Sequence, residues 1–420
     1  MNNETKQSAK TILFTHYGDN WIRGSERCLL DLITHLDKQQ FNAVLWCNQP
    51  LMAEEAKALN IEVYCSDFPL LLGWTAPRFD LFAFAGLIKQ ATQLIKNHNI
   101  SLIHANSAAP CQWLTFAAKK NKIPLICHMH TSYQLRDRLT LGLYQTDMVV
   151  GVSDYVVAPL RKDNKPDTQI NVISNGIDTQ RLLAQPVVSL RESLGINAGD
   201  FVIASVGSLI ARKGFDLLIE AVALLIEKEI SVHLLLIGSG PEYGNLKVQS
   251  KKRGIQQHIS FLGECENPVG LLRGNADIFV STAREEAFGL VLAEASLAGL
   301  AVVAPDTGGV RDVVIDQQTG TLVATENVDA VVGAIEHLYF QPRLCFEMGK
   351  AGQQHVLNNF TIEQNTHKFQ SLYHQQLSTA THKQAWYKSV ALRWDLITSY
   401  CSALKNFYQN STKKGLIHER

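Results

Sequence analysis

The sequence lacks several features that would place the protein in a special class. Its 420 residues include 39 Lys and Arg and 39 Asp and Glu, so no net charge draws nucleic acid or an anionic surface to the whole molecule. None of the eight cysteines forms a C-x-x-C pair, which favours reduced core thiols over a disulfide framework. No run reaches the roughly 18 apolar residues of a membrane span, and the polar start MNNETKQSAK is unlike a signal peptide. We therefore expect a globular, cytoplasmic protein that does not bind nucleic acid.

Short apolar runs recur along the chain, and longer helical patterns separate them. In the first half the runs are TILFTHY, NAVLWCN, IEVYCSD, SLIHANS, PLICHMH, DMVVGVS and INVISNG. In the second half they are FVIASVG, VHLLLIG, ISFLGE, DIFVST, LAVVAPD and GTLVAT. Continuous apolar strands that alternate with helices indicate parallel sheets covered on both faces. The predicted fold class is α/β, with two Rossmann-like, doubly wound parallel-sheet domains.

The strand rhythm pauses between Ile173 and Phe201, and the chain is too long for one ordinary core. We place an N-terminal domain at residues 1–185, a second domain at 186–377 and a tail at 378–420. Ligands of doubly wound sheets bind at the carboxyl ends of the strands, so we expect a ligand shared between the two domains.

The tail contains apolar residues at spacings of three and four, which predict an amphipathic helix. These residues are Trp386, Val390, Trp394, Ile397, Cys401, Leu404 and Tyr408. Lys388, Arg393, Lys405, Lys413 and Lys414 make the tail basic. Such a helix either packs on the first domain or attaches the protein to a membrane surface.

Two carboxylates interrupt the apolar segment EEAFGLVLAEASLAGLAVVAPDTGGV, which spans residues 285–310. We expect Glu286 in a loop and Glu294 inside the helix that follows and ends at Gly299. An ionised carboxylate in apolar surroundings requires a partner. Sugar hydroxyls of a ligand are one possibility. The other is that Glu286 caps the helix and Glu294 pairs with a cation of the protein.

The helix start between these carboxylates suits a phosphate, because the free amides of Phe288, Gly289 and Leu290 and the helix dipole both favour negative charge. A second loop, in VGSLIARKG, carries Arg212 and Lys213 between a strand and a helix. Two cations at such a position suit a diphosphate, although a solvated basic loop is the commoner explanation.

A glycine pattern in LLLIGSGPEYGNL is close to a dinucleotide fingerprint but departs from it by one position. Gly238, Gly240 and Gly244 give G-x-G-x-x-x-G, and Glu264 after the next strand is a candidate ribose ligand. A nicotinamide-dependent oxidoreductase is therefore a remote alternative.

The first domain offers three further candidates. Gly24 precedes an amphipathic helix and lets the backbone approach a ligand, and Ser25 is a candidate helix cap. His128 and His130 follow the fifth strand, as core histidines, as a ligand contact or as part of a metal site. Asn175 stands in ISNGID at a strand end, where a turn is the simplest explanation.

Taken together, these segments are similar to glycosyltransferase family 4, whose members are retaining enzymes with the GT-B fold of two facing Rossmann-like domains. The similarity extends from about Ile12 to Leu377. It rests on the Gly24-Ser25-Glu26 turn, His130, NGID, VGSLIARKG, IGSGPE, FLGE, the E-x7-E pair Glu286 and Glu294, and GLAVVAPDTGGVRDVV.

The resemblance implies roles for the site residues. Glu286 would contact the donor sugar and His130 the sugar near its anomeric carbon, so these two are the catalytic candidates. Glu294 would hold the ribose, and Lys213 would neutralise the diphosphate while Gly24 closes on it. The substrate-binding candidates are Gly24, Asn175, Arg212, Lys213, Phe288, Gly289, Leu290 and Glu294. The family implies neither a cofactor nor a metal, and the chain has no Asp-x-Asp motif.

Three positions depart from the family pattern. Ser208 replaces the usual Arg, a charge that Arg212 would supply instead; Ala287 replaces a Gly, and Asp312 replaces the more frequent Glu.

The implied function is transfer of a sugar from a UDP- or GDP-sugar to a hydroxyl of a glycan or lipid-linked acceptor, in cell-envelope polysaccharide or lipopolysaccharide biosynthesis. The enzyme would work in the cytoplasm, at the inner face of the membrane if the tail attaches there. The main alternative is a non-catalytic protein of the same fold that binds a sugar nucleotide or a partner.

Overall fold

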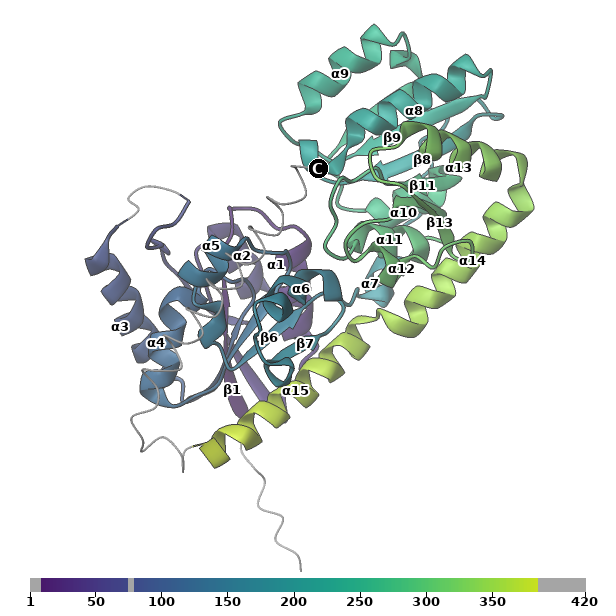
Figure 1. The fold of residues 1–420 in the computed structure, drawn as a ribbon. Helices are drawn as coiled ribbons and strands as arrows, with labels where there is room; N and C mark the ends of the chain where they lie inside the picture. Colours follow the sequence, from purple (N-terminus) through teal and green to yellow (C-terminus); the bar gives the residue numbers. More distant parts are fainter. Residues whose placement is uncertain (1–8, 75–78, 384–420) are drawn as a thin grey trace, which may run out of the picture. The chain divides into compact units, whose positions relative to one another are not determined.

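The computed structural model describes residues 9–74 and 79–383, and the chain divides into two compact units (Figure 1). The first unit comprises Met1–Ser174 and Asn365–Arg420, and the second comprises Asn175–Gln364. Each unit has its own sheet and its own core.

The first unit contains a seven-stranded parallel sheet of order β3-β2-β1-β4-β5-β6-β7. Its strands are β1 (Lys10–His16), β2 (Phe41–Cys47), β3 (Glu62–Cys65), β4 (Ile100–Ala105), β5 (Leu125–Met129), β6 (Met148–Gly151) and β7 (Ile170–Val172). Its helices are α1 (Gly24–Thr34), α2 (Pro50–Ala58), α3 (Leu81–Asn97), α4 (Cys111–Asn121), α5 (Leu135–Thr140), η1 (Leu143–Gln145), α6 (Asp154–Lys162), η2 (Asp167–Gln169) and, from Asn365 onward, α15 (Ile362–Lys383).

The second unit contains a six-stranded parallel sheet of order β10-β9-β8-β11-β12-β13. Its strands are β8 (Phe201–Val206), β9 (Val232–Ile237), β10 (Ile259–Gly263), β11 (Ile278–Val280), β12 (Ala301–Pro305) and β13 (Gly320–Val323). Its helices are α7 (Thr179–Leu183), η3 (Ala211–Lys213), α8 (Phe215–Glu227), α9 (Tyr243–Lys252), η4 (Gln256–His258), α10 (Pro268–Asn275), α11 (Leu290–Leu297), α12 (Val310–Val313), α13 (Val328–Phe340) and α14 (Pro342–Asn359).

Each strand predicted from the sequence is present, and both sheets are doubly wound as predicted. The strand order reverses between β1 and β4 in one sheet and between β8 and β11 in the other. Such switch points open a crevice at the carboxyl ends of the strands, which is where ligands of these sheets bind.

Alternation along β2 builds the two faces of the first sheet. Leu45 and Trp46 are both fully buried, and they point to opposite faces because successive side chains of a strand alternate. Leu45 shares a core with Leu29 of α1. The Trp46 ring packs against Trp113 of α4, with centroids 6.1 Å apart.

Helix α15 belongs to the first core because one of its faces is apolar. Phe369, Leu372 and Tyr373 recur at spacings of three and four and pack with the residues of β1 and β2. The Tyr373 ring meets Phe14 and Phe41 at centroid distances of 6.4 and 5.6 Å. Burying three such side chains stabilises the unit by about 1.5–3 kcal/mol each.

The observed division of the chain therefore differs from the expected boundaries after residues 185 and 377. The chain enters the second unit at Asn175, since α7 packs against α10 and α11, and returns to the first unit at Asn365. The amphipathic pattern from Trp386 to Tyr408 lies outside the described residues and stays a prediction.

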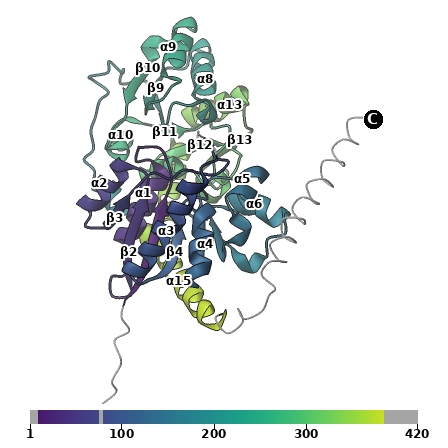
Figure 2. The same ribbon diagram turned by 90° about the vertical axis from the view of Figure 1, so that its left-hand side faces the viewer.

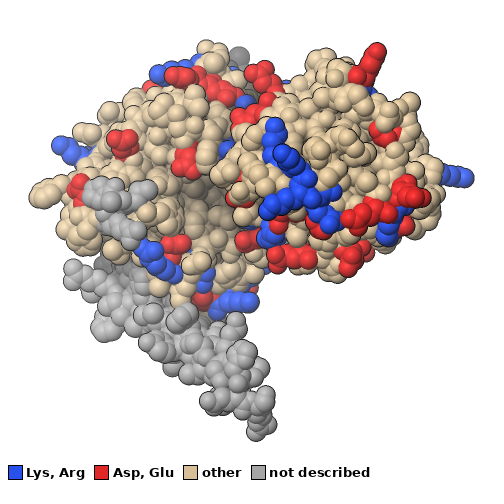
Figure 3. All heavy atoms as spheres, turned by 90° about the horizontal axis from the view of Figure 1, so that it is seen from above, with Lys and Arg blue, Asp and Glu red and all other residues tan. Residues whose placement is uncertain are grey.

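None of the helices within residues 9–74 and 79–383 combines the length and the apolar composition that a bilayer span requires. On the face drawn in Figure 3, side chains of both signs are exposed, so neither sign of charge covers this face alone.

Candidate active site

Two loops lie against each other at the switch point of the second sheet, one after β8 and one after β11. The first loop contains η3 and ends at Gly214, whose φ is 66°. A Cβ at Gly214 would lie 2.0 Å from the carbonyl oxygen of Thr282 in the second loop. Thr282 Oγ1 also donates a hydrogen bond of 2.7 Å to the Gly214 carbonyl. Because only glycine permits this approach together with a positive φ, Gly214 fixes the two loops side by side.

Lys213 and Glu286 form an ion pair across these loops. Lys213 Nζ lies 2.5 Å from Glu286 Oε2, and the side chains are 17% and 13% exposed. The Glu286 carbonyl accepts a hydrogen bond of 3.0 Å from Gly309 N, in the loop after β12. The partner of the Glu286 carboxylate in this structure is thus a cation of the protein. The alternative that Glu286 caps the helix is wrong, because Gly289 is the N-cap.

Two arginines tie the same loops together. Arg212 donates from Nη1 to the Glu285 carbonyl at 2.8 Å. Arg284, which sequence reasoning missed, pairs with Asp216 at 2.6 Å and with Glu326 at 2.9 Å. The hydrogen bond from Arg284 holds the pKa of Asp216 below its usual range, although partial burial opposes the shift. A cation two positions before Glu286, in the loop after β11, was the available signal.

Helix α11 begins at Leu290, as predicted from the sequence. Gly289 is its N-cap with φ of 100°, and Leu290 is its first residue. Phe288 lies before the helix with its side chain 2% exposed, and its ring packs against Phe360 with centroids 5.5 Å apart. The Phe288 side chain is therefore part of the core, and the free amides at the helix start include those of Gly289 and Leu290. Glu294 is half-buried within the helix, as predicted.

Two glycines of the G-x-G-x-x-x-G pattern let the loop after β9 pack closely against the loop after β8. A Cβ at Gly238 would lie 1.9 Å from the Gly207 carbonyl oxygen, and one at Gly240 would lie 2.4 Å from the Leu209 carbonyl oxygen. Gly244, the third glycine of the pattern, lies in α9, where a Cβ would have no neighbouring atom within 4 Å. Close packing of the loops after β8 and β9 thus accounts for the first two glycines without a dinucleotide.

A hydrogen-bonded chain crosses the switch point of the first sheet. His16 Nε2 lies 2.9 Å from Glu26 Oε1, and His16 Nδ1 lies 3.0 Å from Asn106 Nδ2. Asn106 Nδ2 also donates to the Ser25 carbonyl at 3.1 Å, and Asn106 Oδ1 lies 2.9 Å from His130 Nε2. Since the Ser25 carbonyl fixes the orientation of the amide, His130 Nε2 is the protonated nitrogen and its Nδ1 is an acceptor.

Burial and the contact between His16 and Glu26 set the charges of these hydrogen-bonded residues. Burial raises the pKa of Glu26, but the hydrogen bond and the charge of His16 outweigh it and lower that pKa to about 2. Burial, assisted by the neighbouring His128, lowers the pKa of His130 well below its ordinary value. At neutral pH the chain therefore joins an ionised carboxylate at Glu26 to an uncharged imidazole at His130.

His128 is a core histidine rather than a member of this chain. Its side chain is 3% exposed, and neither ring nitrogen has a hydrogen-bond partner among the described residues. Its ring packs at a tilt against His130, with centroids 4.2 Å apart, and against Phe369 at 4.9 Å. Burial lowers the pKa of His128 well below its ordinary value, so the imidazole is uncharged.

The remaining sequence candidates have the following places. Gly24 is the first residue of α1, and the N-cap is Arg23, so the prediction that Ser25 caps this helix is wrong. Ser25 instead donates to Glu26 Oε2 at 3.1 Å. Asn175 is 4% exposed, and its Oδ1 has no hydrogen-bond partner in the part of the chain that the structure describes.

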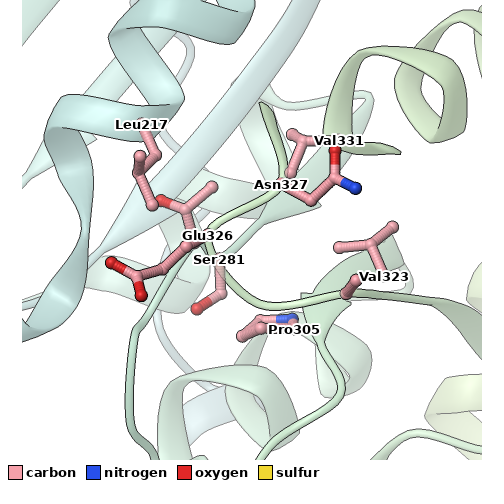
Figure 4. Close-up of a pocket in the computed structure, with 9 residues that line it drawn as sticks. Leu217, Ser281, Pro305, Val323, Glu326, Asn327 and Val331 are labelled. Carbon is pink, nitrogen blue, oxygen red and sulfur yellow. The ribbon is translucent and has the colours of Figure 1, made fainter. Parts of the chain in front are cut away.

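A small cavity of about 10 Å³ lies at the carboxyl edge of the second sheet (Figure 4). Its lining includes Leu217, Ser281, Pro305, Val323, Glu326 and Asn327. This volume holds about one water molecule and no sugar nucleotide. Across residues 9–74 and 79–383 no group of three or more His, Cys, Asp or Glu side chains has the arrangement of a metal site.

Comparison with known proteins agrees with this architecture. Residues 22–181 match the model of "Glycosyltransferase Family 4", and residues 188–355 match that of "Glycosyl transferases group 1". N-acetyl-alpha-D-glucosaminyl L-malate synthase of Bacillus anthracis is 23% identical over 312 residues, which cover 72% of this chain and 80% of the relative. A GDP-mannose-dependent alpha-(1-6)-phosphatidylinositol monomannoside mannosyltransferase of Mycolicibacterium smegmatis is 28% identical over 285 residues, 64% of this chain and 75% of the relative.

Solved structures share the fold. HepE of Anabaena in complex with UDP and glucose superposes with a TM-score of 0.75 at 22% identity, covering 87% of this chain and 100% of that chain. A glycosyltransferase from Rickettsia africae gives a TM-score of 0.76 at 20% identity, covering 88% and 99%. With both family models matched in sequence along most of its length, the chain belongs to glycosyltransferase family 4 and has the GT-B fold.

Proposed function

We propose that this protein is a retaining glycosyltransferase that moves a sugar from a nucleoside diphosphate donor to a hydroxyl of a glycan or lipid-linked acceptor. The observation that carries the proposal is the Lys213–Glu286 pair at the carboxyl edge of the second sheet. A cation and a carboxylate held there at 2.5 Å offer one group for a diphosphate and one for sugar hydroxyls.

The donor diphosphate would lie against Lys213, Arg212 and the amides at the start of α11. The helix dipole and the free amides from Leu290 onward favour negative charge at this position. Glu286 would turn from Lys213 to the sugar hydroxyls once the phosphate takes its place. Glu294, one turn into the helix, would accept hydrogen bonds from the ribose.

The first unit would contribute His130 and Gly24. His130 is uncharged, and its Nδ1 is an acceptor, so it would orient a sugar hydroxyl without repelling positive charge that develops at the anomeric carbon. Gly24 would let the backbone at the start of α1 approach the diphosphate. Asn175, with an unpaired buried Oδ1, is the remaining candidate for a substrate contact.

The reaction we propose breaks the bond between the anomeric carbon and the phosphate oxygen. Negative charge on the departing diphosphate is stabilised by Lys213, Arg212 and the helix start. The acceptor oxygen then bonds to the anomeric carbon on the same face, and its proton passes to the phosphate oxygen that leaves. This route retains configuration and needs no enzyme nucleophile, no metal and no cofactor.

The names of relatives support the acceptor class and the donor. They include the mannosyltransferase above, which is GDP-mannose-dependent, and an alpha-monoglucosyldiacylglycerol synthase of Streptococcus pneumoniae at 26% identity. HepE has been solved with UDP-glucose. We therefore propose a UDP- or GDP-sugar donor and a role in cell-envelope polysaccharide or lipopolysaccharide synthesis, in the cytoplasm at the inner face of the membrane. Attachment through the tail from Trp386 to Tyr408 belongs to this proposal.

A thermal-shift screen of UDP-, GDP- and ADP-sugars tests the function. A donor at one hundred times its dissociation constant stabilises the protein by about 2.7 kcal/mol. The donor so identified is then incubated with the protein, and the released nucleoside diphosphate is measured. Tight binding without turnover on any acceptor would make the protein a non-catalytic binder, and binding of NAD in place of sugar nucleotides would make it an oxidoreductase.

A further inference from the structure

Strand β10 is one edge of the second sheet. It pairs with β9, and within the described residues no strand pairs with its other side. Its sequence, ISFLG, contains neither a charge nor a proline, the residues that usually protect such an edge. At the opposite edge the turn before β13 covers that strand, because the Asp316 side chain accepts a hydrogen bond of 2.9 Å from Leu322 N. Strand β10 therefore offers main-chain donors and acceptors to another strand.

A groove of about 520 Å³ lies between β10 and α9, which Figure 2 shows beside each other. Ile259 and Phe261 line it from β10, where residues two positions apart point to the same face. Val248, which is 55% exposed, and Lys251 line it from α9. The volume lies within the roughly 300–1,000 Å³ of pockets that hold ligands, so the groove has room for several side chains of a partner.

Aromatic contacts hold a cation beside this groove. The ring of Tyr243 packs edge-on against that of Phe261, with centroids 5.4 Å apart. Lys247 Nζ lies 4.9 Å from the ring centroid of Tyr243 and 5.9 Å from that of Phe261, within the range at which a ring attracts a cation. Lys251 is four positions further along α9 and lies on the same side of the helix. The two lysines thus border the apolar residues of the groove.

The groove is positively charged. The residues that line it include two lysines and no acid, and α9 itself contains no Asp or Glu. Glu220 and Glu227 of the neighbouring α8 pair with Arg253, at 3.4 and 2.8 Å. In the part of the chain that the structure describes, Lys247 and Lys251 have no ion-pair partner. Both lysines can therefore pair with acidic groups of a ligand.

We propose that this groove binds an extended, acidic segment of a partner protein, which adds a strand to β10. The outer side of β10 would bond the main chain of the segment. On the face turned toward α9, apolar side chains of the segment would pack on Ile259 and Phe261. Acidic side chains on the same face would pair with Lys247 and Lys251.

Other occupants fit the groove less well. A glycan or a nucleic acid would use the lysines but would leave the strand edge without a partner. A second copy of the groove would bring lysines against lysines, which repel each other. An acidic peptide uses the strand edge, the apolar residues and the lysines together.

The groove is separate from the candidate active site. Gln256 lines it, and Ile259 is the first residue of β10, so the groove begins at the amino end of a parallel sheet. The loops that carry Lys213 and Glu286 lie at the carboxyl ends of β8 and β11. The inference therefore goes beyond the proposed function and does not depend on the donor or the reaction.

Fluorescence anisotropy with the full chain and a labelled peptide, TVTETVTET, tests the inference without any donor. The valines and glutamates of this peptide share one face of an extended strand, and TVTKTVTKT is the control peptide. Val248→Gln should weaken binding of the acidic peptide roughly tenfold. Lys247→Gln and Lys251→Gln should each weaken it about fivefold, and added salt should weaken binding to the wild type.

Two matched variants separate the groove from its surroundings. Val187→Gln replaces a valine of the second unit that is 54% exposed outside the groove, and Lys252→Gln replaces an exposed lysine of α9 that does not line it. Both should leave binding of the acidic peptide unchanged. Hydrogen exchange of the β10 amides should slow when the peptide is bound, because the added strand takes up main-chain groups of β10.

Binding that requires Val248 and Lys251 and that protects the β10 amides supports the inference. Equal binding of the two peptides overturns it, as does a heparin oligosaccharide or a single-stranded oligonucleotide that binds as tightly as the acidic peptide. Binding that leaves exchange in β10 unchanged also overturns it. So does an acidic peptide that fails to bind, or a dimer of the wild type that Val248→Gln abolishes. Circular dichroism of each variant excludes unfolding as the cause.

Discussion

Lys213 and Glu286 stand 73 positions apart in the chain and form an ion pair of 2.5 Å at the edge of the second sheet. Gly214 makes this possible, because the loop that carries Lys213 can press against the Thr282 carbonyl only where there is no Cβ. The protein thus holds a cation next to a carboxylate before any ligand arrives. Under the proposed function, an entering phosphate would take the place of the carboxylate at Lys213.

Removing either member of this pair should abolish most donor turnover while the fold survives. For Lys213→Ala and for Glu286→Gln we expect turnover to fall by about 10²–10³, the usual cost of removing one group that stabilises developing charge. Released nucleoside diphosphate is the measurement. The control is Lys228→Ala, which breaks the exposed Lys228–Glu336 pair of 2.7 Å in the same unit and should change neither turnover nor stability noticeably. Full activity in both test variants would contradict the assigned roles.

Gly214→Ala should destabilise the second unit. The new methyl group would meet the Thr282 carbonyl oxygen at 2.0 Å, and the residue would keep a φ of 66° that alanine disfavours. We expect a loss of at least about 1–3 kcal/mol from the strained backbone alone. Gly244→Ala is the control, because it lies in α9 with open space around it and should be neutral or stabilising.

Two probes can locate that effect. The tryptophans within residues 9–383 are Trp21, Trp46, Trp74 and Trp113, which all belong to the first unit. Circular dichroism should therefore show an earlier transition in Gly214→Ala, while tryptophan fluorescence reports the first unit at its original midpoint. An unshifted dichroism transition would show that the two loops can part at little cost.

Asn106→Ala should release the constraint on the tautomer of His130 without unfolding the first unit. Asn106 Oδ1 is the acceptor that keeps the proton of His130 on Nε2, so its removal lets both neutral tautomers form. Nitrogen chemical shifts of the imidazole measure the tautomer directly. In Asn106→Asp an acceptor oxygen remains, and we expect the Nε2 tautomer to be retained there. An unchanged spectrum in Asn106→Ala would show that the amide does not fix the ring.

The positions of residues within one loop or one helix could be predicted from the sequence, because their separation along the chain fixes their separation in space. The loop positions of Lys213 and Glu286 and the helical position of Glu294 were predicted in this way and are confirmed, whereas the roles of these residues stay predictions. The strands were equally predictable, since a strand of a parallel sheet that is covered on both faces appears in the sequence as a continuous apolar run. Their confirmation in both sheets also located the loops at the carboxyl ends.

Contacts between distant segments were not predictable. His16, Glu26, Asn106 and His130 come together only because β1 and β4 are neighbours and β5 lies next to β4. No local pattern encodes that order, although three of these residues do end or directly follow a strand. The return of α15 to the first core depends likewise on Tyr373 reaching His104, 269 positions away.

Acid should weaken the first unit through its buried histidines. Burial lowers the pKa of His104 to about 3, and it lowers the pKa values of His128 and His130 well below 6.5. The unfolded chain binds a proton at each of these residues below about pH 6.5, whereas the folded chain does not. Unfolding therefore takes up protons, and the free energy of unfolding should fall as the pH drops below 6.5, by about 1.4 kcal/mol per pH unit for each histidine.

His128→Phe should make this dependence shallower by one histidine. The ring nitrogens of His128 have no partner among the described residues, so phenylalanine gives up no hydrogen bond and removes one proton site. Urea unfolding followed by tryptophan fluorescence at pH 7.5 and pH 5.5 gives the slope. Tyr373→Phe is the matched control: it deletes the hydroxyl that lies 2.7 Å from His104 Nδ1 and should lower stability at both pH values while all three histidines still titrate. The same slope in His128→Phe as in the wild type would mean that this imidazole is protonated in the folded protein, contrary to the uncharged state that we assign to it.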